Sequence, residues 1–293
     1  MPVTQHCARR LGRFALATGL AVGLVALAGC GSSSRSSTSP RVVVSTGIVG
    51  AIVREVVGPD VAIEVVIPNG KDPHEFAPSA RDIEMMTNAA IVVVNGSGLE
   101  AGMSDVLGAL EPTQRFELAD HVTLRGADPH LWLDPVTVRQ AIPALAEALG
   151  AAVGRDLSGD ARRVATDLDD LDSRIARTID TIEDCNLVTD HEALAYFAAR
   201  YGCTIIGSVV PGLSTAGEST AGDLADLKTA IARTGVATIF TEANASGDVA
   251  RAVADDLGVA VVELNVERLP RSDDYGDLMM QLAQAIAVGL GKK

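Results

Sequence analysis

Cysteine and positive charge are both scarce in this sequence of 293 residues. Four cysteines in a chain of this length are too few for a scaffold built from disulfides. Lysine and arginine number 24 against 38 aspartates and glutamates, a formal net charge of −14. Such a chain repels polyphosphate, so we expect no nucleic-acid partner. The hydrophobic fraction of 47 % is too high for a disordered chain and suits one large or two medium globular domains.

Signatures of nucleotide binding and of hydrolysis are missing as well. The sequence has no Gly-x-x-x-x-Gly-Lys-Ser/Thr phosphate loop and no Gly-x-Ser-x-Gly nucleophile elbow. His191-Glu192 begins like the zincin motif His-Glu-x-x-His, but the fourth residue after His191 is Ala195. These catalytic classes are therefore excluded on their motifs.

The first forty residues are predicted to be a targeting signal rather than part of a fold. Residues 1–13 carry three arginines and no acid, and an apolar run of 15 residues follows from Phe14 to Ala28. That run is short for a membrane span, which needs about 20 residues, and it is typical of a secretory signal peptide. The Ser-rich stretch 31–40 predicts a flexible tether.

The signal ends in Leu27-Ala28-Gly29-Cys30, which resembles the lipobox of bacterial lipoproteins. The resemblance implies that residues 1–29 are removed and that a diacylglycerol is attached to the sulfur of Cys30. Residues 30–40 would then tether the fold to the outer face of a membrane, which is an extracytoplasmic location. A plain signal peptide with an incidental cysteine is the alternative.

Runs of β-branched residues alternate with helical patterns in two stretches of the chain, which is typical of βαβ units with a parallel sheet. We therefore predict an α/β protein with two similar lobes, 41–157 and 185–293. In the first lobe the expected strands are 41–46, 61–67 and 90–94, and the expected helices are 47–57, 79–89 and 99–110. In the second lobe strands are expected from 187 and at 203–209, 236–241 and 259–264, with helices at 193–200, 221–234, 246–257 and 274–290.

A long amphipathic helix is predicted between the two lobes, over residues 158–184, with Ser158 as a candidate N-cap. Apolar residues recur there at steps of three and four and form one stripe: Val164, Leu168, Leu171, Ile175, Ile179 and Ile182. A continuous helix is stiffer than a loop, so we expect it to limit closure of the lobes.

Three of the five histidines stand in loops that follow predicted strands. His74 and His130 each end an Asp-Pro-His tripeptide, and His191 follows the first strand of the second lobe. Proline fixes its own φ angle, so less entropy is lost when these two imidazoles are held in place. Because ligands gather outside the carboxyl ends of parallel strands, the three histidines are candidates to meet in the cleft between the lobes. His121 is predicted to be an ordinary strand or loop residue.

The histidine segments resemble the substrate-binding lipoproteins of ABC importers for zinc and manganese. The resemblance rests on Gly-x-x-Pro-His-x-x-x-Pro-Ser within 69–80, Asn-Gly-x-Gly-Leu-Glu at 95–100, Asp-Pro-His-x-Trp-Leu-Asp-Pro at 128–135 and His-x-Ala-x-x-Tyr-Phe-x-x-x-Tyr-Gly within 190–202. It extends over about 42–290. It implies two α/β lobes joined by one long rigid helix, with the metal site in the cleft between them.

The resemblance also implies a set of metal ligands. His74 and His130 take the places of the first two ligands, and His191 takes the third, where zinc-type members have His and manganese-type members have Glu. The fourth ligand is usually an Asp three residues before a Gly, and Glu267 stands at that position.

Glu267 is the one departure from the family pattern, because Pro270 replaces the Gly and glutamate is one methylene longer than aspartate. Either the backbone of its loop lies farther from the metal than in the family, or Glu267 does not bind the metal. In the second case Asp273 and Asp274 are the alternatives.

The donor set favours zinc. Three imidazoles and one carboxylate suit a tetrahedral Zn²⁺, whereas Mn²⁺ prefers more oxygen donors and lies lowest in the affinity order. Zn²⁺ is therefore the predicted cargo and Mn²⁺ the weaker alternative. Because ligand imidazoles must be neutral, we expect zinc affinity to fall steeply below about pH 6.

The resemblance implies an extracytoplasmic lipoprotein that captures Zn²⁺ and delivers it to the membrane permease of an ABC importer. The ATPase must be another chain, because this one has no phosphate loop. We expect a monomer that breaks no bond and is not an enzyme. The alternatives are a zinc hydrolase with an open three-histidine site, and an adhesin with the same fold.

Cys185 and Cys203 bracket a predicted β-α-β stretch at the start of the second lobe. Each precedes or begins a strand, and these strands should be parallel neighbours, so the two Cα atoms could lie within about 7 Å. A disulfide is predicted, with two buried thiols or a zinc ligand pair as alternatives. Trp132, beside His130, is predicted to be a packing residue.

Overall fold

The computed structural model describes residues 41–215, 217–242 and 247–291, which belong to one compact unit, Thr38–Lys293. The predicted signal peptide 1–29, the lipid anchor Cys30 and the tether to residue 40 lie outside the described residues. Among the helices that are described, none has both the length and the apolar character that crossing a membrane requires.

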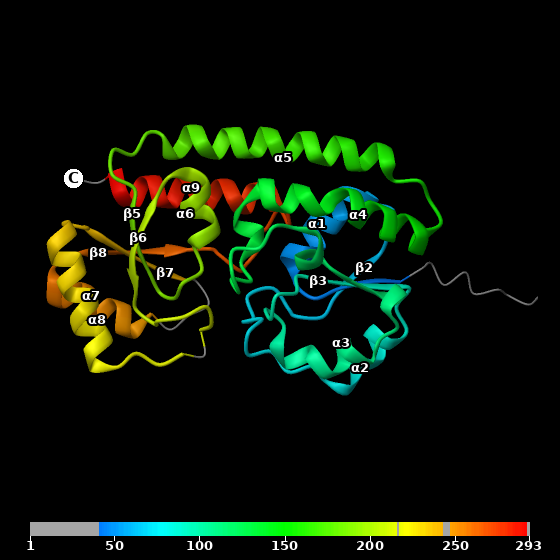
Figure 1. Ribbon diagram of the computed structural model, residues 1–293, viewed down its shortest axis with the longest axis horizontal. Coiled ribbons are helices and arrows are strands. Elements are labelled where there is room, and N and C mark those ends of the chain that lie inside the picture. Colours follow the sequence, from blue (N-terminus) through cyan, green and yellow to red (C-terminus); the bar gives the residue numbers. More distant parts are fainter. Residues whose placement is uncertain (1–40, 216, 243–246, 292–293) are drawn as a thin grey trace, which may run out of the picture. The chain divides into compact units, whose positions relative to one another are not determined.

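Two parallel sheets form the frame of the protein (Figure 1). Each sheet has four strands, and the two share one strand order. The first sheet has the order β2-β1-β3-β4, with β1 (Val42–Val44), β2 (Ile63–Val65), β3 (Ile91–Val94) and β4 (Arg115–Glu117). The second has the order β6-β5-β7-β8, with β5 (Asn186–Thr189), β6 (Thr204–Ser208), β7 (Thr238–Glu242) and β8 (Ala260–Leu264). The predicted α/β fold with two parallel-sheet lobes is confirmed. In each sheet the strand order reverses beside the first strand, which is where such folds bind ligands.

The central strands β1 and β3 explain why their sequences read as unbroken apolar runs. Every residue of both strands is buried, and Val43 pairs with Glu64 on one side and with Val92 on the other. A parallel strand covered on both faces has no solvent side on which polar residues would be favoured.

Helices of the first lobe are α1 (Gly47–Val57), α2 (Ala80–Thr87), α3 (Ser104–Ala109) and α4 (Pro135–Val153). The predicted helix 99–110 is shorter, because a 3₁₀ turn at Ala101–Met103 precedes α3. The sequence prediction missed β4 and α4 entirely. Pro143 lies inside α4, where its missing N–H argues against a helix. Burial of one face of α4 outweighs that loss, and Asp134 caps its start by accepting the N–H of Val136 at 2.9 Å.

Helices of the second lobe agree with the prediction to within a few residues: α6 (Ala195–Tyr201), α7 (Ala221–Thr234), α8 (Asp248–Leu257) and α9 (Tyr275–Gly291). Helix α7 begins where Thr220 and Asp223 form a reciprocal capping box. The capping box accounts for the start of the helix at Ala221, which agrees with the predicted start.

Helix α5 (Ser158–Ile179) is the long helix between the lobes, and five residues of its predicted apolar stripe are buried along it. It packs against α1 and α4 of the first lobe and against α6 and α9 of the second (Figure 1). It ends at Ile179, so Ile182 lies beyond it. Leu157 holds the N-cap position predicted for Ser158, and the side chain of Asp156 accepts the Ser158 N–H at 2.9 Å.

Cys185 and Cys203 are joined by a disulfide, with their Cα atoms 4.6 Å apart. Cys185 directly precedes β5 and Cys203 directly precedes β6, and these strands are parallel neighbours. The bridge therefore lies at the amino ends of the strands, whereas His191 follows the carboxyl end of β5.

Candidate metal centre

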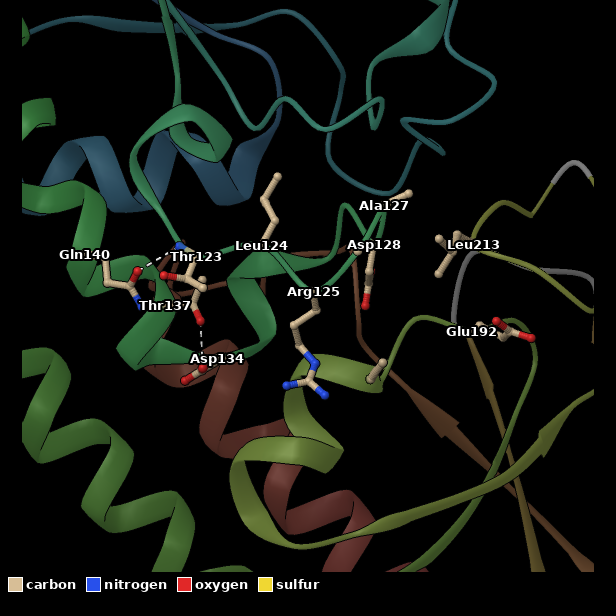
Figure 2. Close-up of a pocket in the computed structure, with 12 residues that line it drawn as sticks. Thr123, Leu124, Arg125, Ala127, Asp128, Asp134, Thr137, Gln140, Glu192 and Leu213 are labelled. Atoms are coloured by element: carbon tan, nitrogen blue, oxygen red, sulfur yellow. Dashed lines mark hydrogen bonds between the residues drawn. The ribbon is translucent and has the colours of Figure 1, made fainter.

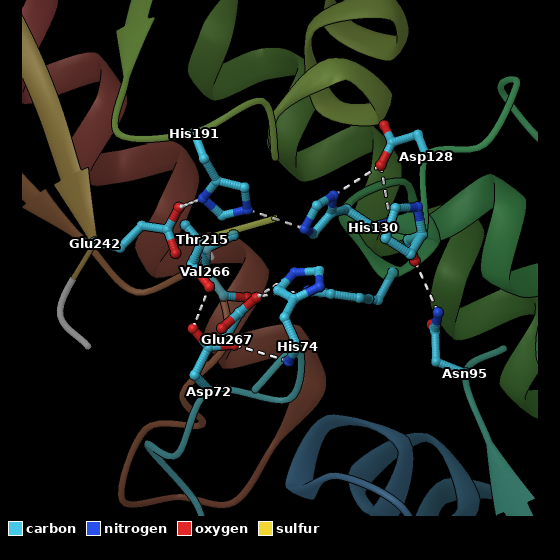
Figure 3. A network of polar contacts seen from close by, with 12 residues as sticks. Asp72, His74, Asn95, Asp128, His130, His191, Thr215, Glu242, Val266 and Glu267 are labelled. Carbon is cyan, nitrogen blue, oxygen red and sulfur yellow. Dashed lines mark hydrogen bonds and ion pairs between the residues drawn. The ribbon is translucent and has the colours of Figure 1, made fainter. Parts of the chain in front are cut away.

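Three histidines and one glutamate converge at the carboxyl ends of the strands (Figure 3). Each offers one ligand atom, and these atoms all lie within 4.8 Å of one another; the residues are His74, His130, His191 and Glu267. They stand in four separate loops, which follow β2, β4, β5 and β8. The structure thus brings together the four residues that were named from the sequence.

Asp273 and Asp274, the alternative carboxylates, lie outside this group. Asp274 serves another purpose, because its Oδ1 accepts the N–H of Asp277 in the first turn of α9 at 2.7 Å. Asp273 is exposed.

The two Asp-Pro-His tripeptides form the same local turn. Oδ1 of Asp72 accepts the backbone N–H of His74 at 2.8 Å, and Oδ1 of Asp128 accepts that of His130 at 2.9 Å. Such Asx turns fix the backbone two residues after the acid. Proline therefore accounts for only part of the stiffness predicted for these segments, and the aspartate of each tripeptide adds the rest.

His130 is completely buried, and a carboxylate orients its ring. Its Nδ1 lies 2.7 Å from Oδ1 of Asp128, which fixes the tautomer with the proton on Nδ1 and leaves Nε2 as the donor atom. Burial lowers the pKa of His130, although the contact with Asp128 acts in the opposite direction. The imidazole is therefore neutral at pH 7 and able to bind a cation.

The loop of His130 is supported from β3. Asn95, the residue after β3, donates from Nδ2 to the carbonyl of Pro129 at 2.8 Å, and Oε1 of Glu100 accepts the N–H of Asn95 at 2.8 Å. Both residues are buried. The segment 95–100, which carries the Asn-Gly-x-Gly-Leu-Glu motif, therefore holds the second Asp-Pro-His turn in place.

His191 is oriented by Glu242, which was not among the predicted site residues. Oε1 of Glu242, the last residue of β7, lies 2.5 Å from Nδ1 of His191, and both side chains are buried. Burial favours the neutral form of His191, but the Glu242 carboxylate outweighs it and raises the pKa of His191. The sequence did offer a signal for this role, because Glu242 ends the wholly buried strand β7. A carboxylate buried at that position requires a partner.

The four donors are held close together and away from water. The imidazole rings of His74, His130 and His191 have centroids 5.1 to 5.8 Å apart, and Oε1 of Glu267 lies 3.6 Å from Nε2 of His74. The side chains of His74 and Glu267 are 5 % and 2 % exposed. Burial, together with the repulsion that His74 and His130 would exert on each other if both were protonated, lowers the pKa of His74 to about 4.

The Nε2 atoms of His130 and His191 face each other at 3.2 Å. Two nitrogen lone pairs at that distance repel unless a proton or a cation lies between them. Two nitrogens bound to one tetrahedral zinc at about 2.0–2.1 Å would be about 3.3 Å apart. The observed spacing fits a hydrogen bond between the two rings and also fits a cation bound by both.

Two of the cavities around this site are large enough to hold several water molecules. One of about 270 Å³ is lined by His191 and by Asp72, Asp190 and Thr215, among others. A larger one of about 730 Å³ is lined by residues 123–128 and part of α4 from the first lobe, and by Glu192, Ala195 and Leu213 from the second (Figure 2). Asp128 lines the larger cavity and also contacts His130.

His121 lies apart from the donors. Its exposed ring stacks on Phe116, with centroids 4.5 Å apart. Trp132 is a packing residue, as predicted, with 3 % of its surface exposed. Its indole N–H also donates to the carbonyl of Val266 at 3.0 Å, a contact that the sequence did not indicate.

The sequence matches the protein family described as "zinc-uptake complex component A, periplasmic" (ZnuA) over residues 42–289. The match begins at the first residue of β1 and ends in α9, so it covers both sheets and all four donors.

The relatives of this chain differ in the metal for which they are named. The zinc-binding protein TroA of Treponema pallidum is 28 % identical over 243 residues, which are 78 % of each chain. The manganese-binding lipoprotein MntA of Halalkalibacterium halodurans is 26 % identical over 260 residues, 83 % of this chain and 85 % of its own. The structure of the periplasmic zinc-binding protein TroA from T. pallidum superposes with a TM-score of 0.79 at 25 % identity, covering 86 % of this chain and 99 % of that one. The choice of metal therefore rests on the donor atoms of this chain.

Proposed function

Because the chain belongs to the family of periplasmic zinc-uptake component A, we propose that it captures Zn²⁺ outside the cytoplasm and delivers it to an ABC metal importer. One observation carries the proposal: three imidazoles and one carboxylate, all buried or nearly so, place their ligand atoms within 4.8 Å of one another. We assign His74, His130, His191 and Glu267 as the ligands of the transported ion.

The donor set supports zinc over manganese. Three nitrogens and one oxygen fill a tetrahedral site, while Mn²⁺ favours sites richer in oxygen. The preference for zinc over manganese depends on His191, because an oxygen donor in its place would leave only two nitrogen donors. The spacing of 3.2 Å between the Nε2 atoms of His130 and His191 also suits one small tetrahedral ion.

A hydrolytic zinc site would need an open coordination position for water. Glu267 lies beside His74, and we assign it the fourth place, which would leave no open position. A closed site binds and releases an ion without breaking a bond, which supports a transport role. The chain is then not an enzyme.

The remaining assignments extend the proposal to the whole chain. Cys30 carries the diacylglycerol, residues 30–40 tether the fold to the membrane, and residues 1–29 are the removed signal. The partners are the permease of the importer and its separate ATPase, and the protein acts as a monomer. The lobes are 41–157 and 185–293, joined by the linker 158–184, of which α5 (Ser158–Ile179) is the helical part.

The proposal is tested by zinc stoichiometry and affinity, measured by elemental analysis and by competitive titration of the purified protein. Wild type should hold one zinc, and Glu267→Ala should bind it about 100-fold more weakly, because one of four ligands is lost. Glu263→Ala is the matched control, since Glu263 is an exposed residue of β8. One zinc of unchanged affinity in Glu267→Ala would leave three histidines and an open position, and would favour the hydrolase instead.

A further inference from the structure

The loop that carries Glu267 follows a strand of the second sheet, yet its hydrogen bonds run to the first lobe. Asn69 makes a reciprocal pair with Leu269: its Nδ2 donates to the Leu269 carbonyl at 3.1 Å, and its Oδ1 accepts the Leu269 N–H at 2.9 Å. On the other side of Glu267, the indole N–H of Trp132 donates to the carbonyl of Val266 at 3.0 Å. Glu267 thus stands between two backbone positions that are tied to the first lobe.

Packing leaves this loop little room to shift. Val266 and Leu269 are 2 % and 7 % exposed and belong to the hydrophobic core that includes α1. A Cβ atom at Gly47 would lie 3.3 Å from the Leu269 side chain, and one at Gly70 would lie 3.1 Å from that of Arg268. The cavity beside Glu267 is only about 10 Å³, room for one water molecule at most.

Trp132 joins this loop to a proposed ligand. Its ring centroid lies 5.3 Å from that of His130, two residues earlier in the chain. Its carbonyl accepts the hydroxyl of Tyr275, the first residue of α9, at 2.5 Å. The same residue therefore contacts the His130 side of the site, the Glu267 loop and the start of α9.

His191 is held differently. Its backbone carbonyl accepts the hydroxyl of Thr189 at 2.7 Å, and its ring contacts Glu242. Both partners belong to strands of the second sheet. His191 is therefore oriented from the second lobe.

We propose that Asn69 and Trp132 are positioning residues for Glu267. They hold its carboxylate on the first lobe, so that His74, His130 and Glu267 form one three-donor unit and the second lobe contributes His191. The inference rests on the proposed function, since Glu267 matters here as a metal ligand. The identity of the carboxylate is set by the loop after β8, but its distance from the histidines is set by two side chains of the other lobe.

The test is a double-mutant cycle on zinc affinity, measured by competitive titration of the full chain. Trp132→Phe removes the indole N–H and keeps an aromatic ring, and Asn69→Ala removes both hydrogen bonds to Leu269. Each should raise the zinc Kd about tenfold, the lower end of the usual effect of residues that orient metal ligands. In a Glu267→Ala background each should change the Kd less than about twofold, because the group they position is gone. Asn88→Ala is the matched control, since the side chain of Asn88 bonds the exposed end of α2.

An equal loss in both backgrounds would overturn the proposal, because Asn69 and Trp132 would then act through His74, His130 or the fold. No loss in either background would overturn it as well. Failure of the proposed function looks different: Glu267→Ala and His130→Ala would then both leave zinc binding unchanged. Bound Co²⁺ gives a second readout, because its visible absorption depends on coordination geometry and should change in Trp132→Phe if the carboxylate moves. Trp132→Phe also keeps the test valid if Asn69→Ala does not fold.

Discussion

The two lobes share one strand order, but they hold their histidines by different means. In the first lobe the partner of His130 is Asp128, two residues earlier, which contacts both the backbone N–H and Nδ1. In the second lobe the partner of His191 is Glu242, which reaches it from another strand. Both carboxylates fix the tautomer and free Nε2 for a metal. The comparison shows that one chemical task is met by local sequence in one lobe and by tertiary pairing in the other.

The difference also appears in the protonation of the two rings. His130 has no exposed surface, and burial lowers its pKa in spite of Asp128. His191 is also buried, but Glu242 outweighs that burial and raises its pKa. Near neutral pH, His130 is therefore ready for a cation, whereas zinc must displace a proton from His191 in a fraction of the molecules.

The largest effect should come from removing either histidine. A four-ligand zinc site is worth about 10–16 kcal/mol, so one ligand contributes about 3 kcal/mol. We expect His130→Ala and His191→Ala each to weaken zinc binding about 100-fold, measured by competitive titration at pH 7.5. His121→Ala, which removes an exposed ring stacked on Phe116, should leave the affinity unchanged. If only one of the two variants loses affinity, the site draws its donors from a single lobe.

The next effect in size should come from removing the disulfide, which lies wholly within the second lobe. Cys185 and Cys203 are 18 residues apart, and closing a loop of that size stabilises a protein by about 3 kcal/mol. Cys185→Ser with Cys203→Ser should lower the free energy of unfolding by this amount, measured by urea denaturation of the metal-free protein. Zinc affinity should change less than about threefold, because the bridge lies at the opposite end of β5 from His191. A large loss of affinity would show that the bridge positions the site.

Glu242→Gln should show how much of the pH dependence of zinc affinity comes from His191 rather than from His130. Protons compete with zinc for imidazole, so a raised pKa extends that competition to higher pH. Removing the charge of Glu242 lowers the pKa of His191 and should flatten the fall in zinc affinity between pH 7.5 and pH 6. At pH 8 the same variant should bind zinc about tenfold more weakly, because the ring is less well oriented.

Asp128→Asn is the comparison for that experiment, again by zinc titration across pH 6–8. It should lose affinity without flattening the profile, because burial already lowers the pKa of His130. Equal flattening in both variants would remove the distinction drawn between the two lobes.

The smallest effect concerns a hydrogen bond between the lobes. The hydroxyl of Thr215 donates to Oδ2 of Asp72, whose other oxygen accepts the N–H of His74. Thr215→Val should cost about 1 kcal/mol, a few-fold loss of zinc affinity, because one hydrogen bond is removed. Thr229→Val on α7 is the control, since that hydroxyl bonds only the preceding turn of its helix. An unchanged affinity would show that Asp72 orients His74 without help from the second lobe.

Most of the fold was predictable because its signals are local. The apolar run of β1, the stripe of α5 and the capping box of α7 each occupy a few adjacent turns or residues. Helix α4 is an exception, because Pro143 lies in its interior and proline disfavours helix interiors. Burial of α4 in the tertiary structure stabilises the helix in spite of Pro143.

By itself, the sequence determined the α/β class and placed three histidines in loops after strands, and its resemblance to a known family added Glu267 as the fourth donor. These properties depend on residue type and on short spacings. Only the tertiary structure decided which carboxylates face the histidines from other strands, and that Asn69 and Trp132 hold the Glu267 loop. The reason is physical: buried polar groups must find partners, and here those partners come from segments far apart in the chain.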